Sequence, residues 1–240
     1  MNIYAVSDIH GFYDEFKEAL NKSGFKPNNN NDLLVVCGDI FDRGSKNIEC
    51  MQYLNSLNNV VLVMGNHERL LVDMLTRGYP LSHDKHNHTI ETAYDLILYY
   101  GLQDLPLDKA YAKVLSILNK TWLNKFVNYY ETNNYVFVHG YIPENKDWRN
   151  GNWSEAAWLC GIEQHLFTNL SNNHKRLENK TVVCGHWHCS YAHHLTEGTP
   201  EFGPGANFEP YISKGIICID ACTASTRKVN IVKLKDERLN

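Results

Sequence analysis

In the stretch Leu33-Leu34-Val35-Val36-Cys37-Gly38-Asp39-Ile40-Phe41-Asp42-Arg43-Gly44, an apolar run changes at Gly38 into a polar segment bounded by glycines. The apolar run is short and rich in β-branched residues, which predicts a buried strand rather than a helix. The polar segment predicts a sharp turn that presents two carboxylates and a guanidinium, because glycine permits tight backbone turns. The same succession recurs along the chain and indicates the fold class.

Six further runs have the same apolar, β-branched character. Helical patterns separate the first three runs, so the sequence predicts βαβ units and an α/β fold. We expect mixed β-sheets flanked by α-helices, because residues 128–138 predict an antiparallel hairpin. The six runs are residues 3–6, 60–64, 135–138, 181–184, 215–219 and 228–234.

Three local features complete this prediction. Residues 12–22 form one amphipathic helical pattern, and Ser45 is expected to cap a second helix that continues to about Leu57. The hairpin turn Asn133-Asn134 is expected to adopt positive φ. Residues from about 68 to 126 predict a helical insert, with a polar break from Gly78 to Thr89, within a single domain covering residues 1–240.

Composition narrows the class of protein. Hydrophobic residues make up 43% of the chain and charged residues 21%, which is typical of a globular protein. The net charge of −4 and the lack of a basic stripe make nucleic acid an unlikely partner. No apolar stretch approaches the roughly 20 residues that cross a bilayer, so no membrane association is expected. Seven scattered cysteines without a CxxC pair, and no signal peptide, predict a reduced, cytoplasmic protein.

Polar clusters follow five of the predicted strands. Any one cluster could be a turn or a helix cap, but the carboxyl ends of strands in an open α/β sheet meet at one edge. Carboxylate, imidazole and amide ligands without cysteine suit Mn, Fe or Zn. Asp39 lies near the centre of the set and is the natural bridging ligand for two cations about 3.5–4 Å apart. The clusters are Ser7-Asp8-Ile9-His10-Gly11, Gly38 to Gly44, Gly65-Asn66-His67-Glu68, His139-Gly140 and Gly185-His186-Trp187-His188.

Together the five motifs resemble those of the calcineurin-like metallophosphoesterase superfamily. Their order from Asp8 to His188 is Asp-x-His, Gly-Asp-x-x-Asp-Arg-Gly, Gly-Asn-His-Glu, His-Gly and Gly-His-x-His. The second motif is similar to that of the phosphoprotein phosphatase branch, which includes bacterial and phage-type serine/threonine phosphatases and symmetrical diadenosine tetraphosphate hydrolases. The resemblance implies a metallophosphoesterase-type sandwich of mixed sheets, and no such signature covers the insert or the tail.

The resemblance also implies a ligand set for two divalent ions, for which we expect Mn²⁺, with Fe or Zn as alternatives. One residue, Asp39, would be shared by both ions. His188 is the second histidine of its motif and would complete the shell of the first ion. The implied ligands are Asp8, His10, Asp39 and His188 for the first ion, and Asp39, Asn66, His139 and His186 for the second.

Three further residues would carry the catalysis that the resemblance implies. His67 would protonate the leaving oxygen, and Asp42 would orient His67 and favour its charged form. Arg43 would grip the phosphate, although a surface salt bridge is the plain alternative. A metal-bound hydroxide would attack phosphorus directly, without a covalent enzyme intermediate.

One departure from the family pattern bears on the substrate. The family often has a second phosphate-binding arginine in a Leu-Trp-x-Arg-like stretch, where this chain has Ala157-Trp158-Leu159-Cys160. Cys160 stands at the place of that arginine, and Arg149 or Arg176 could substitute for it. The aromatic residues Trp148, Trp153 and Trp158 are interpreted as core or cleft wall rather than a base-stacking platform.

Three hypotheses about function follow. The first is a phosphomonoesterase of the serine/threonine phosphatase type, acting on a phosphorylated protein or a small phosphate ester. The second keeps the chemistry but takes symmetrical dinucleoside polyphosphates or another nucleotide phosphodiester. The third is a binding scaffold on an inactive phosphatase fold, which the retention of every expected ligand, of His67 and of Arg43 disfavours.

Overall fold

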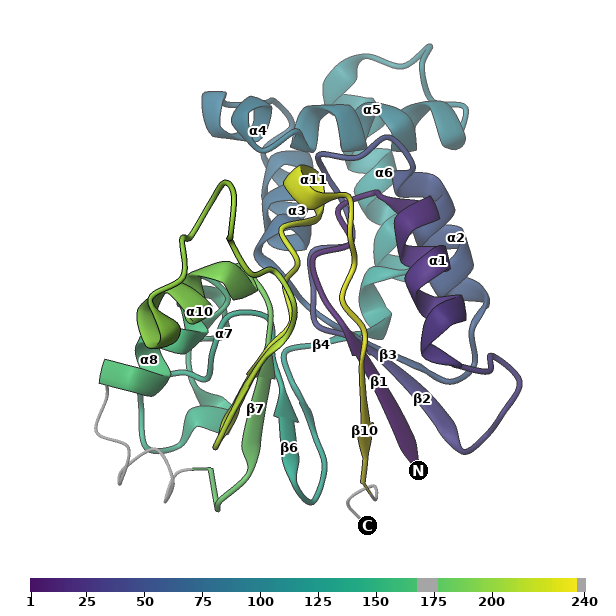
Figure 1. Ribbon diagram of the computed structural model, residues 1–240. Helices are drawn as coiled ribbons and strands as arrows, with labels where there is room; N and C mark the ends of the chain where they lie inside the picture. The colour runs from purple at the N-terminus through teal and green to yellow at the C-terminus, as the bar shows by residue number, and fades with distance from the viewer. Residues whose placement is uncertain (168–176, 237–240) are drawn as a thin grey trace.

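The first of two β-sheets in the computed structural model is built around the N-terminal strand (Figure 1). The structure describes residues 1–167 and 177–236. The strand order is β10-β1-β2-β3-β4, in which β1 to β4 are parallel and β10 is antiparallel to β1. The strands are β1 (Asn2–Val6), β2 (Asp32–Val36), β3 (Val60–Val63), β4 (Phe126–Val127) and β10 (Val232–Lys235).

The second sheet packs face to face with the first. Its order is β5-β6-β7-β9-β8, in which β6, β7 and β9 are parallel and the two edge strands are antiparallel. The prediction of an α/β sandwich of mixed sheets is therefore confirmed. The strands are β5 (Tyr130–Glu131), β6 (Tyr135–Phe137), β7 (Thr181–Cys184), β8 (Tyr211–Ser213) and β9 (Ile216–Cys218).

Side chains alternate between two apolar cores along each central strand, as the two-residue period of a strand requires. Ile3 and Ala5 of β1 belong to the core between the sheets, where they join residues such as Phe137 and Val183 of the second sheet. Tyr4 belongs instead to the core beneath the helices of the first sheet. Both faces of β1 and β2 are thus covered, which explains why their sequences are continuously apolar.

Helices cover the two outer faces of the sandwich. Figure 1 shows α1, α2 and α6 beside the first sheet, and α7, α8 and α10 beside the second. The helices are α1 (Tyr13–Ser23), α2 (Asn47–Ser56), α3 (Asn66–Arg77), α4 (Ser82–His86), α5 (Thr89–Tyr99), α6 (Leu107–Thr121), η1 (Leu123–Lys125), η2 (Trp148–Asn150), α7 (Trp153–Ala156), α8 (Gly161–Phe167), α10 (Cys189–Glu197) and α11 (Thr223–Thr226).

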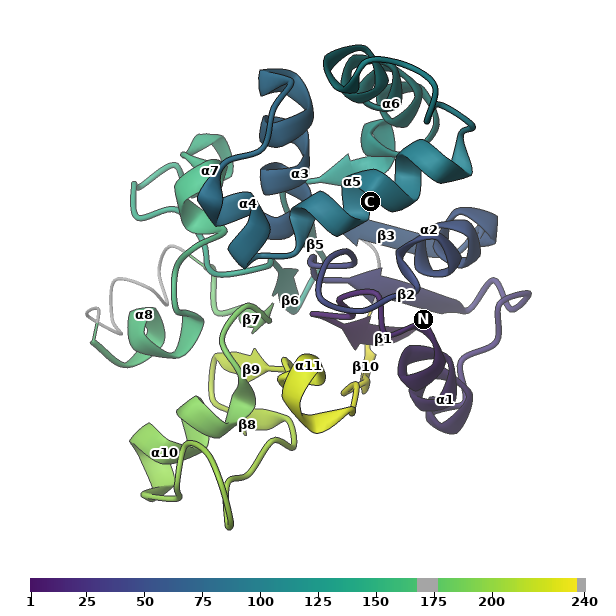
Figure 2. The same cartoon turned by 90° about the horizontal axis from the view of Figure 1, so that it is seen from above.

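The segment expected to form a helical insert contains α3 to α6. In Figures 1 and 2, α4 and α5 lie across the carboxyl ends of the strands of the first sheet. The predicted polar break from Gly78 to Thr89 is not entirely irregular, because α4 lies within it, and Asp84 accepts the backbone N–H of Leu81 at the start of this helix. None of the helices in the described ranges is long and apolar enough to span a membrane.

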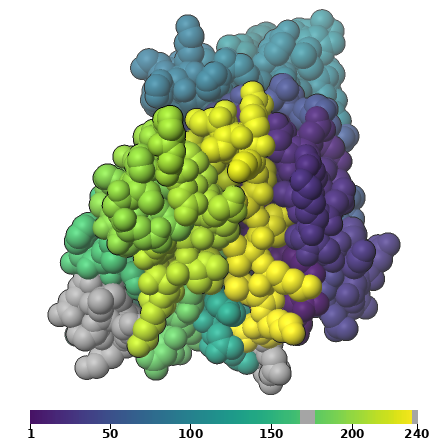
Figure 3. Space-filling model, viewed as in Figure 1, coloured from purple at the N-terminus to yellow at the C-terminus, as the bar shows by residue number. Residues whose placement is uncertain are grey.

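Two predicted element boundaries are wrong. Ser45 does not cap α2, which begins at Asn47 after Lys46, because the preceding turn is bound to the first loop: Lys46 N–H donates to the Gly11 carbonyl at 3.0 Å. The last strand pairs with β1 only from Val232 onwards, whereas residue 228 was expected to begin it. Residues 227–231 instead connect α11 to β10, and Figure 3 shows this C-terminal segment as a continuous band on the surface.

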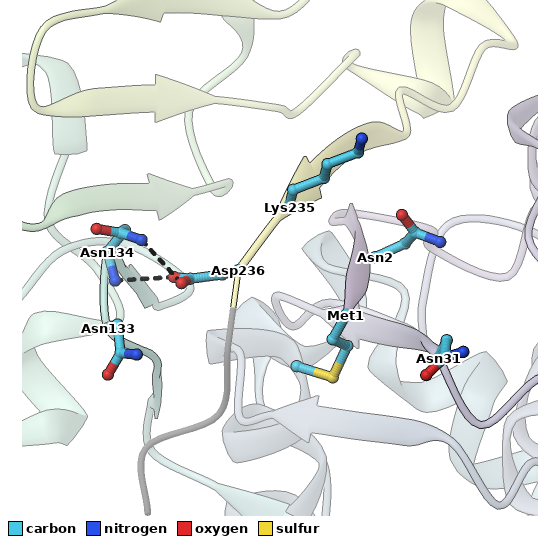
Figure 4. A pocket seen from close by; sticks show the side chains of 7 residues that line it. All are labelled: Met1, Asn2, Asn31, Asn133, Asn134, Lys235 and Asp236. Carbon is cyan, nitrogen blue, oxygen red and sulfur yellow. Dashed lines mark hydrogen bonds between the residues drawn. The ribbon is translucent and has the colours of Figure 1, made fainter.

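The hairpin of β5 and β6 is confirmed, but its turn differs from the prediction. Neither Asn133 nor Asn134 has positive φ. The turn is held instead by Asp236, whose carboxylate accepts hydrogen bonds from Thr132 Oγ1 at 2.7 Å and from Asn134 N–H at 2.8 Å. Figure 4 shows Asp236 beside a cavity of about 570 Å³ at the end of the sheets where β1 begins.

Candidate metal centre

The five predicted motifs come together at the carboxyl ends of β1, β2, β3, β6 and β7. Hydrogen bonds link the loops: Asp8 N–H donates to the Gly38 carbonyl at 3.1 Å and His10 N–H donates to the Asp39 carbonyl at 2.9 Å. The backbone here is strained, since left-handed φ values are costly for residues with side chains and gather at functional sites. Residues with such values are Asp8 (52°), His10 (50°), Asp39 (55°), Asp42 (75°), Arg43 (66°) and His186 (67°).

Asp39 is the common member of two overlapping groups that could each hold a metal ion. The first group is His10, Asp39 and His67, and the second is Asp39, His139 and His186, with ligand atoms within 4.8 Å of one another in each. Asp39 Oδ2 lies 3.7 Å from His10 Nε2 and 3.3 Å from His139 Nε2. A carboxylate placed between two sets of imidazoles fits the bridging role that the sequence predicts for Asp39.

Backbone carbonyls fix the tautomers of two predicted ligands. His10 Nδ1 donates to the Phe41 carbonyl at 2.9 Å, and His139 Nδ1 donates to the Cys37 carbonyl at 2.8 Å. In each ring the Nε2 atom is therefore the one turned towards Asp39. Such a bond from the second ring nitrogen is the usual support of a metal-binding histidine, because it orients the ring and raises its basicity as a ligand.

Asp8 and Asn66 complete the cluster. Asp8 Oδ1 lies 3.8 Å from His10 Nε2, and its Oδ2 accepts the backbone N–H of His186 at 2.9 Å, across 178 residues of sequence. Asn66 Oδ1 lies 2.7 Å from His139 Nε2. The donor set therefore combines carboxylate, amide and imidazole atoms, all on buried side chains or, at His186, a partly buried one. This set fits a borderline divalent cation.

Burial and charge set the protonation of the histidines in ways that suit this site. Burial lowers the pKa of His186 to about 3 and also lowers that of His10, so both rings are neutral and able to ligate. Burial lowers the pKa of His139, but the charge and hydrogen bond of Asp39, the charge of Asp8 and the bond to the Cys37 carbonyl together outweigh burial and raise this pKa to about 10. The same concentration of negative charge attracts a cation, and a bound cation favours the neutral form of the ring.

His67 and Asp42 form a separate, directly bonded pair. His67 Nδ1 lies 2.6 Å from Asp42 Oδ2, which leaves Nε2 facing the cluster, 3.9 Å from Asp39 Oδ2. Burial lowers the pKa of His67, but Asp39 and the bond to Asp42 outweigh burial and raise it overall. Arg43 Nη2 lies 3.3 Å from His67 Nε2, so the guanidinium and the imidazole meet at one point.

His188 does not join the cluster in this structure. It precedes α10, where its Nδ1 accepts the backbone N–H of Tyr191 at 3.2 Å. Its Nε2 lies 3.3 Å from Glu201 Oε1, and its ring packs against Phe202. Both ring nitrogens are thus engaged away from Asp39, so the structure gives no support to metal binding by His188.

Glu68 was not singled out from the sequence, although it organises the site. Its carboxylate is fully buried and accepts the backbone N–H groups of Asp39, Ile40 and Gly65 at 2.8–3.0 Å. Burial raises the pKa of Glu68 to about 7. The sequence did contain a pattern that could have predicted this role of Glu68. Glu68 stands three residues after Gly65, at the position where an acidic residue closes a capping box.

Of the two arginines predicted to replace the second phosphate-binding arginine, Arg149 is engaged elsewhere in the part of the chain that the structure describes. Cys160 is buried, and burial raises its pKa to about 12, so it is an unreactive thiol. The Arg149 guanidinium is bound to the carboxylates of Glu131 and Glu178. Arg176 lies outside the described residues. Arg43 is thus the guanidinium that the described part of the chain brings to His67.

Comparisons with known proteins agree with this architecture. The sandwich and its cluster of aspartate, asparagine and histidine side chains define the class of metal-dependent phosphoesterases. A sequence profile described as calcineurin-like phosphoesterase matches residues 1–191. The chain belongs to the calcineurin-like phosphoesterase family, whose members are enzymes that hydrolyse phosphate esters.

Curated relatives match only part of the chain. A symmetrical bis(5′-nucleosyl)-tetraphosphatase of Buchnera aphidicola is 44% identical over 73 residues, which is 30% of this chain and 26% of that protein. One from Aromatoleum aromaticum is 33% identical over 128 residues, which is 51% of this chain and 46% of that protein. The chain therefore spans about a quarter to a half of the length of these relatives.

Solved structures resemble the chain along nearly its whole length. A cold-active protein-tyrosine phosphatase of a Shewanella species has a TM-score of 0.63 at 18% identity, covering 98% of this chain and 75% of that one. A putative diadenosine tetraphosphatase has a TM-score of 0.55 at 15% identity, covering 98% and 94%. At these identities the likeness concerns the fold.

Proposed function

We propose that the chain is a two-metal phosphoesterase and that it hydrolyses symmetrical dinucleoside polyphosphates. Two divalent cations, for which we propose Mn²⁺, supply an activated water and neutralise charge on the phosphoryl oxygens when they are bound. Asp8 and His10 would hold one cation, Asn66, His139 and His186 would hold the other, and Asp39 would be shared by both. The observation that carries this proposal is that the imidazoles of His10 and His139 both approach Oδ2 of Asp39, at 3.7 and 3.3 Å. The Asp39 carboxylate is buried, and although burial acts to raise its pKa, the nearby histidines lower it overall.

The side chains beside the cations divide the remaining chemistry. The Arg43 guanidinium only donates, so Nε2 of His67 accepts from it in the structure. Once Arg43 has turned to the phosphate, His67 in its charged form carries a proton on Nε2, and its Nδ1 bond to Asp42 keeps that nitrogen directed at the cluster. This proton passes to the leaving oxygen, which makes His67 the general acid. The guanidinium of Arg43, 3.3 Å from the same Nε2, binds a phosphoryl oxygen as a planar donor. Proton donor and phosphate ligand therefore act at the same P–O bond.

Two observations favour a dinucleotide over the phosphomonoester that the sequence suggested first. The first is the name shared by the curated relatives, symmetrical bis(5′-nucleosyl)-tetraphosphatase. The second is Cys160, which cannot replace a second arginine, and a dianionic monoester needs such a donor more than an internal phosphate does. A phosphorylated protein remains the second candidate substrate, and the accompanying experiment compares the two.

An aromatic wall beside the cluster suits a nucleobase. Trp148 and Trp153 are buried core residues, but Trp158 is 49% exposed, and its ring lies edge-on to that of His186 with centroids 5.9 Å apart. Trp187, directly after His186, is 37% exposed. Exposed indole faces stack readily on bases, and such stacking contributes about 1–3 kcal/mol per base.

A substrate panel tests this proposal. The protein reconstituted with Mn²⁺ is incubated with diadenosine tetraphosphate, a phosphoserine peptide and a bis-aryl phosphate, and products are separated by anion exchange. We expect diadenosine tetraphosphate to be cleaved fastest, with ADP as the product of symmetrical cleavage. Faster release of phosphate from the peptide would make the chain a protein phosphatase. No cleavage of any activated aryl phosphate would favour a binding scaffold instead.

A further inference from the structure

Helix α5 of the insert donates two hydrogen bonds to Asp42. Thr89 Oγ1 lies 2.9 Å from Asp42 Oδ2, and Thr92 Oγ1 lies 2.5 Å from Asp42 Oδ1. An ionised carboxylate only accepts, so both hydroxyl groups donate. The Oδ2 atom that receives the Thr89 bond is also the one bonded to His67 Nδ1. The carboxylate therefore lies between the insert and the imidazole.

This contact is sealed from solvent. The exposed fraction is 0% for Asp42, Thr89 and Thr92, and 1% for His67. Water cannot replace either hydroxyl, so loss of one leaves a carboxylate oxygen short of a partner, which is costly in a buried site. Burial thus makes the geometry of Asp42 depend on the two threonines.

The spacing of the threonines matches the shape of a carboxylate. Thr89 is the first residue of α5 and Thr92 stands three positions later, so both lie on one face of the helix. Each hydroxyl reaches a different oxygen, which fixes the plane of the carboxylate as well as its position. Because Thr92 holds Oδ1, the Oδ2 atom is turned towards His67 and its rotation is opposed.

A third residue of α5 supports the same loop through Asn47. Asp95, three residues beyond Thr92, accepts a hydrogen bond from Asn47 Nδ2 at 3.1 Å. Asn47 Oδ1 in turn accepts the backbone N–H of Asp42 at 3.0 Å. The main chain and the side chain of Asp42 are therefore both held by bonds that lead back to α5.

We propose that Thr89 and Thr92 are positioning residues for the general acid. They hold the Asp42 carboxylate in the orientation that directs His67 Nε2 to the leaving oxygen. This inference rests on the proposed function, because it assumes that His67 donates the proton. The helical insert would then contribute to catalysis through α5. The contribution of Thr89 and Thr92 is indirect, because they act on His67 through Asp42.

Leaving-group dependence separates this role from a general loss of structure. Phenyl phosphate has a poor leaving group that needs a proton, whereas 2,4-dinitrophenyl phosphate has a good one that does not. We expect Thr89→Val and Thr92→Val to lower kcat about tenfold on phenyl phosphate, as typical for supporting residues, with little effect on the dinitrophenyl ester or on either KM. Thr89→Ser and Thr92→Ser, which keep the hydroxyl, should restore the rate.

Thr132→Val is the matched control, because Thr132 Oγ1 also donates to a buried carboxylate, Asp236, at the other end of the sheets. It should leave the ratio of the two rates unchanged. An equal loss on both esters in Thr89→Val and Thr92→Val would overturn the inference. If the valine variants do not fold, Thr89→Ala and Thr92→Ala remove the hydroxyl without adding a methyl group to the site.

A second measurement does not depend on activity. In metal-free protein labelled with ¹⁵N-histidine, the Nδ1–H proton of His67 should appear far downfield, because it lies in a short bond to a carboxylate. His67→Ala assigns the signal. We expect it to move upfield and exchange faster in Thr89→Val and Thr92→Val, and an unchanged signal in both would overturn the inference. If His67→Ala shows no leaving-group contrast, the proposed acid role fails, while this spectrum still tests the threonines.

Discussion

Replacement of Gly65 by alanine should disturb the metal centre, although the φ and ψ of Gly65 itself suit any residue. Gly65 precedes α3 with φ −86° and ψ 177°, a conformation that any residue adopts. A Cβ atom at this position would lie 2.2 Å from Asp39 Oδ1, 2.5 Å from Asp39 N and 2.8 Å from Glu68 Oε2. The added methyl group therefore collides with the proposed bridging carboxylate and with the residue that holds its loop.

The size of the effect follows from these distances. Since ordinary contacts of a Cβ atom begin above 3 Å, Asp39 Oδ1 has to move by roughly 1 Å, and a displacement of that size costs about 10²-fold in rate. Overpacking of this kind costs about 1–3 kcal/mol of stability. We expect the affinity for Mn²⁺ to fall about 10–100-fold, as it does when the support of a metal ligand is lost.

Titration calorimetry of metal-free protein with Mn²⁺ measures this loss, and thermal unfolding checks that Gly65→Ala is folded. The control is Gly78→Ala at the other end of α3, where a Cβ atom would meet nothing nearer than Asp108 Cβ at 3.8 Å. Because Gly78 has φ 83°, the control should lose about 1 kcal/mol of stability but keep its metal affinity. Wild-type affinity in Gly65→Ala would refute the placement of Asp39 in the metal site.

Three further changes test other parts of the molecule. His67→Ala should keep its bound Mn²⁺ by metal analysis yet turn over about 10²–10⁴-fold more slowly, and equal rates would remove His67 from the mechanism. Trp158→Ala should raise KM for diadenosine tetraphosphate about tenfold at constant kcat, and an unchanged KM in initial-rate assays would exclude nucleobase stacking there. Glu131→Gln should lower the free energy of unfolding by about 3 kcal/mol at pH 7, because it leaves buried Lys180 unpaired. Burial acts to raise the pKa of Glu131, but Arg149 and Lys180 lower it overall, so its stabilisation is present above the unfolded value near 4.5 and is lost as pH falls through the lower folded value. The difference between wild type and Glu131→Gln in urea titrations should therefore shrink in acid, and a constant difference would contradict this ion pair.

The sequence predicted the strands and the meeting of the motifs because both depend on local patterns. Runs such as residues 33–36 are apolar throughout since both faces of their sheet are covered, and parallel strands deliver their following loops to one edge. The central place of Asp39 among the motifs followed from that rule, whereas its sharing between two sets of ligands was implied by the family resemblance. Element boundaries followed less well, as at Ser45, where a bond from Lys46 to the first loop decides the helix start.

What the sequence could not predict depends on contacts between distant segments. The bonds from Thr89 and Thr92 to Asp42 span 47 and 50 residues, and no periodicity in the insert points to them. Likewise, the orientation of His188 is set by Glu201, in a loop without any recognisable motif. Asp236 replaces the expected turn chemistry of the hairpin across 104 residues. In each case the hydrogen-bond partner is a side chain outside the local segment, so no local sequence pattern indicates it.

The division of the cluster between two sheets has a consequence for stability. Asp8, Asp39 and Asn66 follow strands of the first sheet, whereas His139 and His186 follow strands of the second. Cations bound there would cross-link the two sheets of the sandwich. They would stabilise the folded state, because the unfolded chain does not bring these ligands together. At a free ion concentration one hundred times the dissociation constant, one such ion adds about 2.7 kcal/mol to the free energy of unfolding. The melting temperature of this protein should consequently rise with the concentration of divalent metal in the buffer. Removal of the metal with a chelator should first weaken the packing between the two sheets.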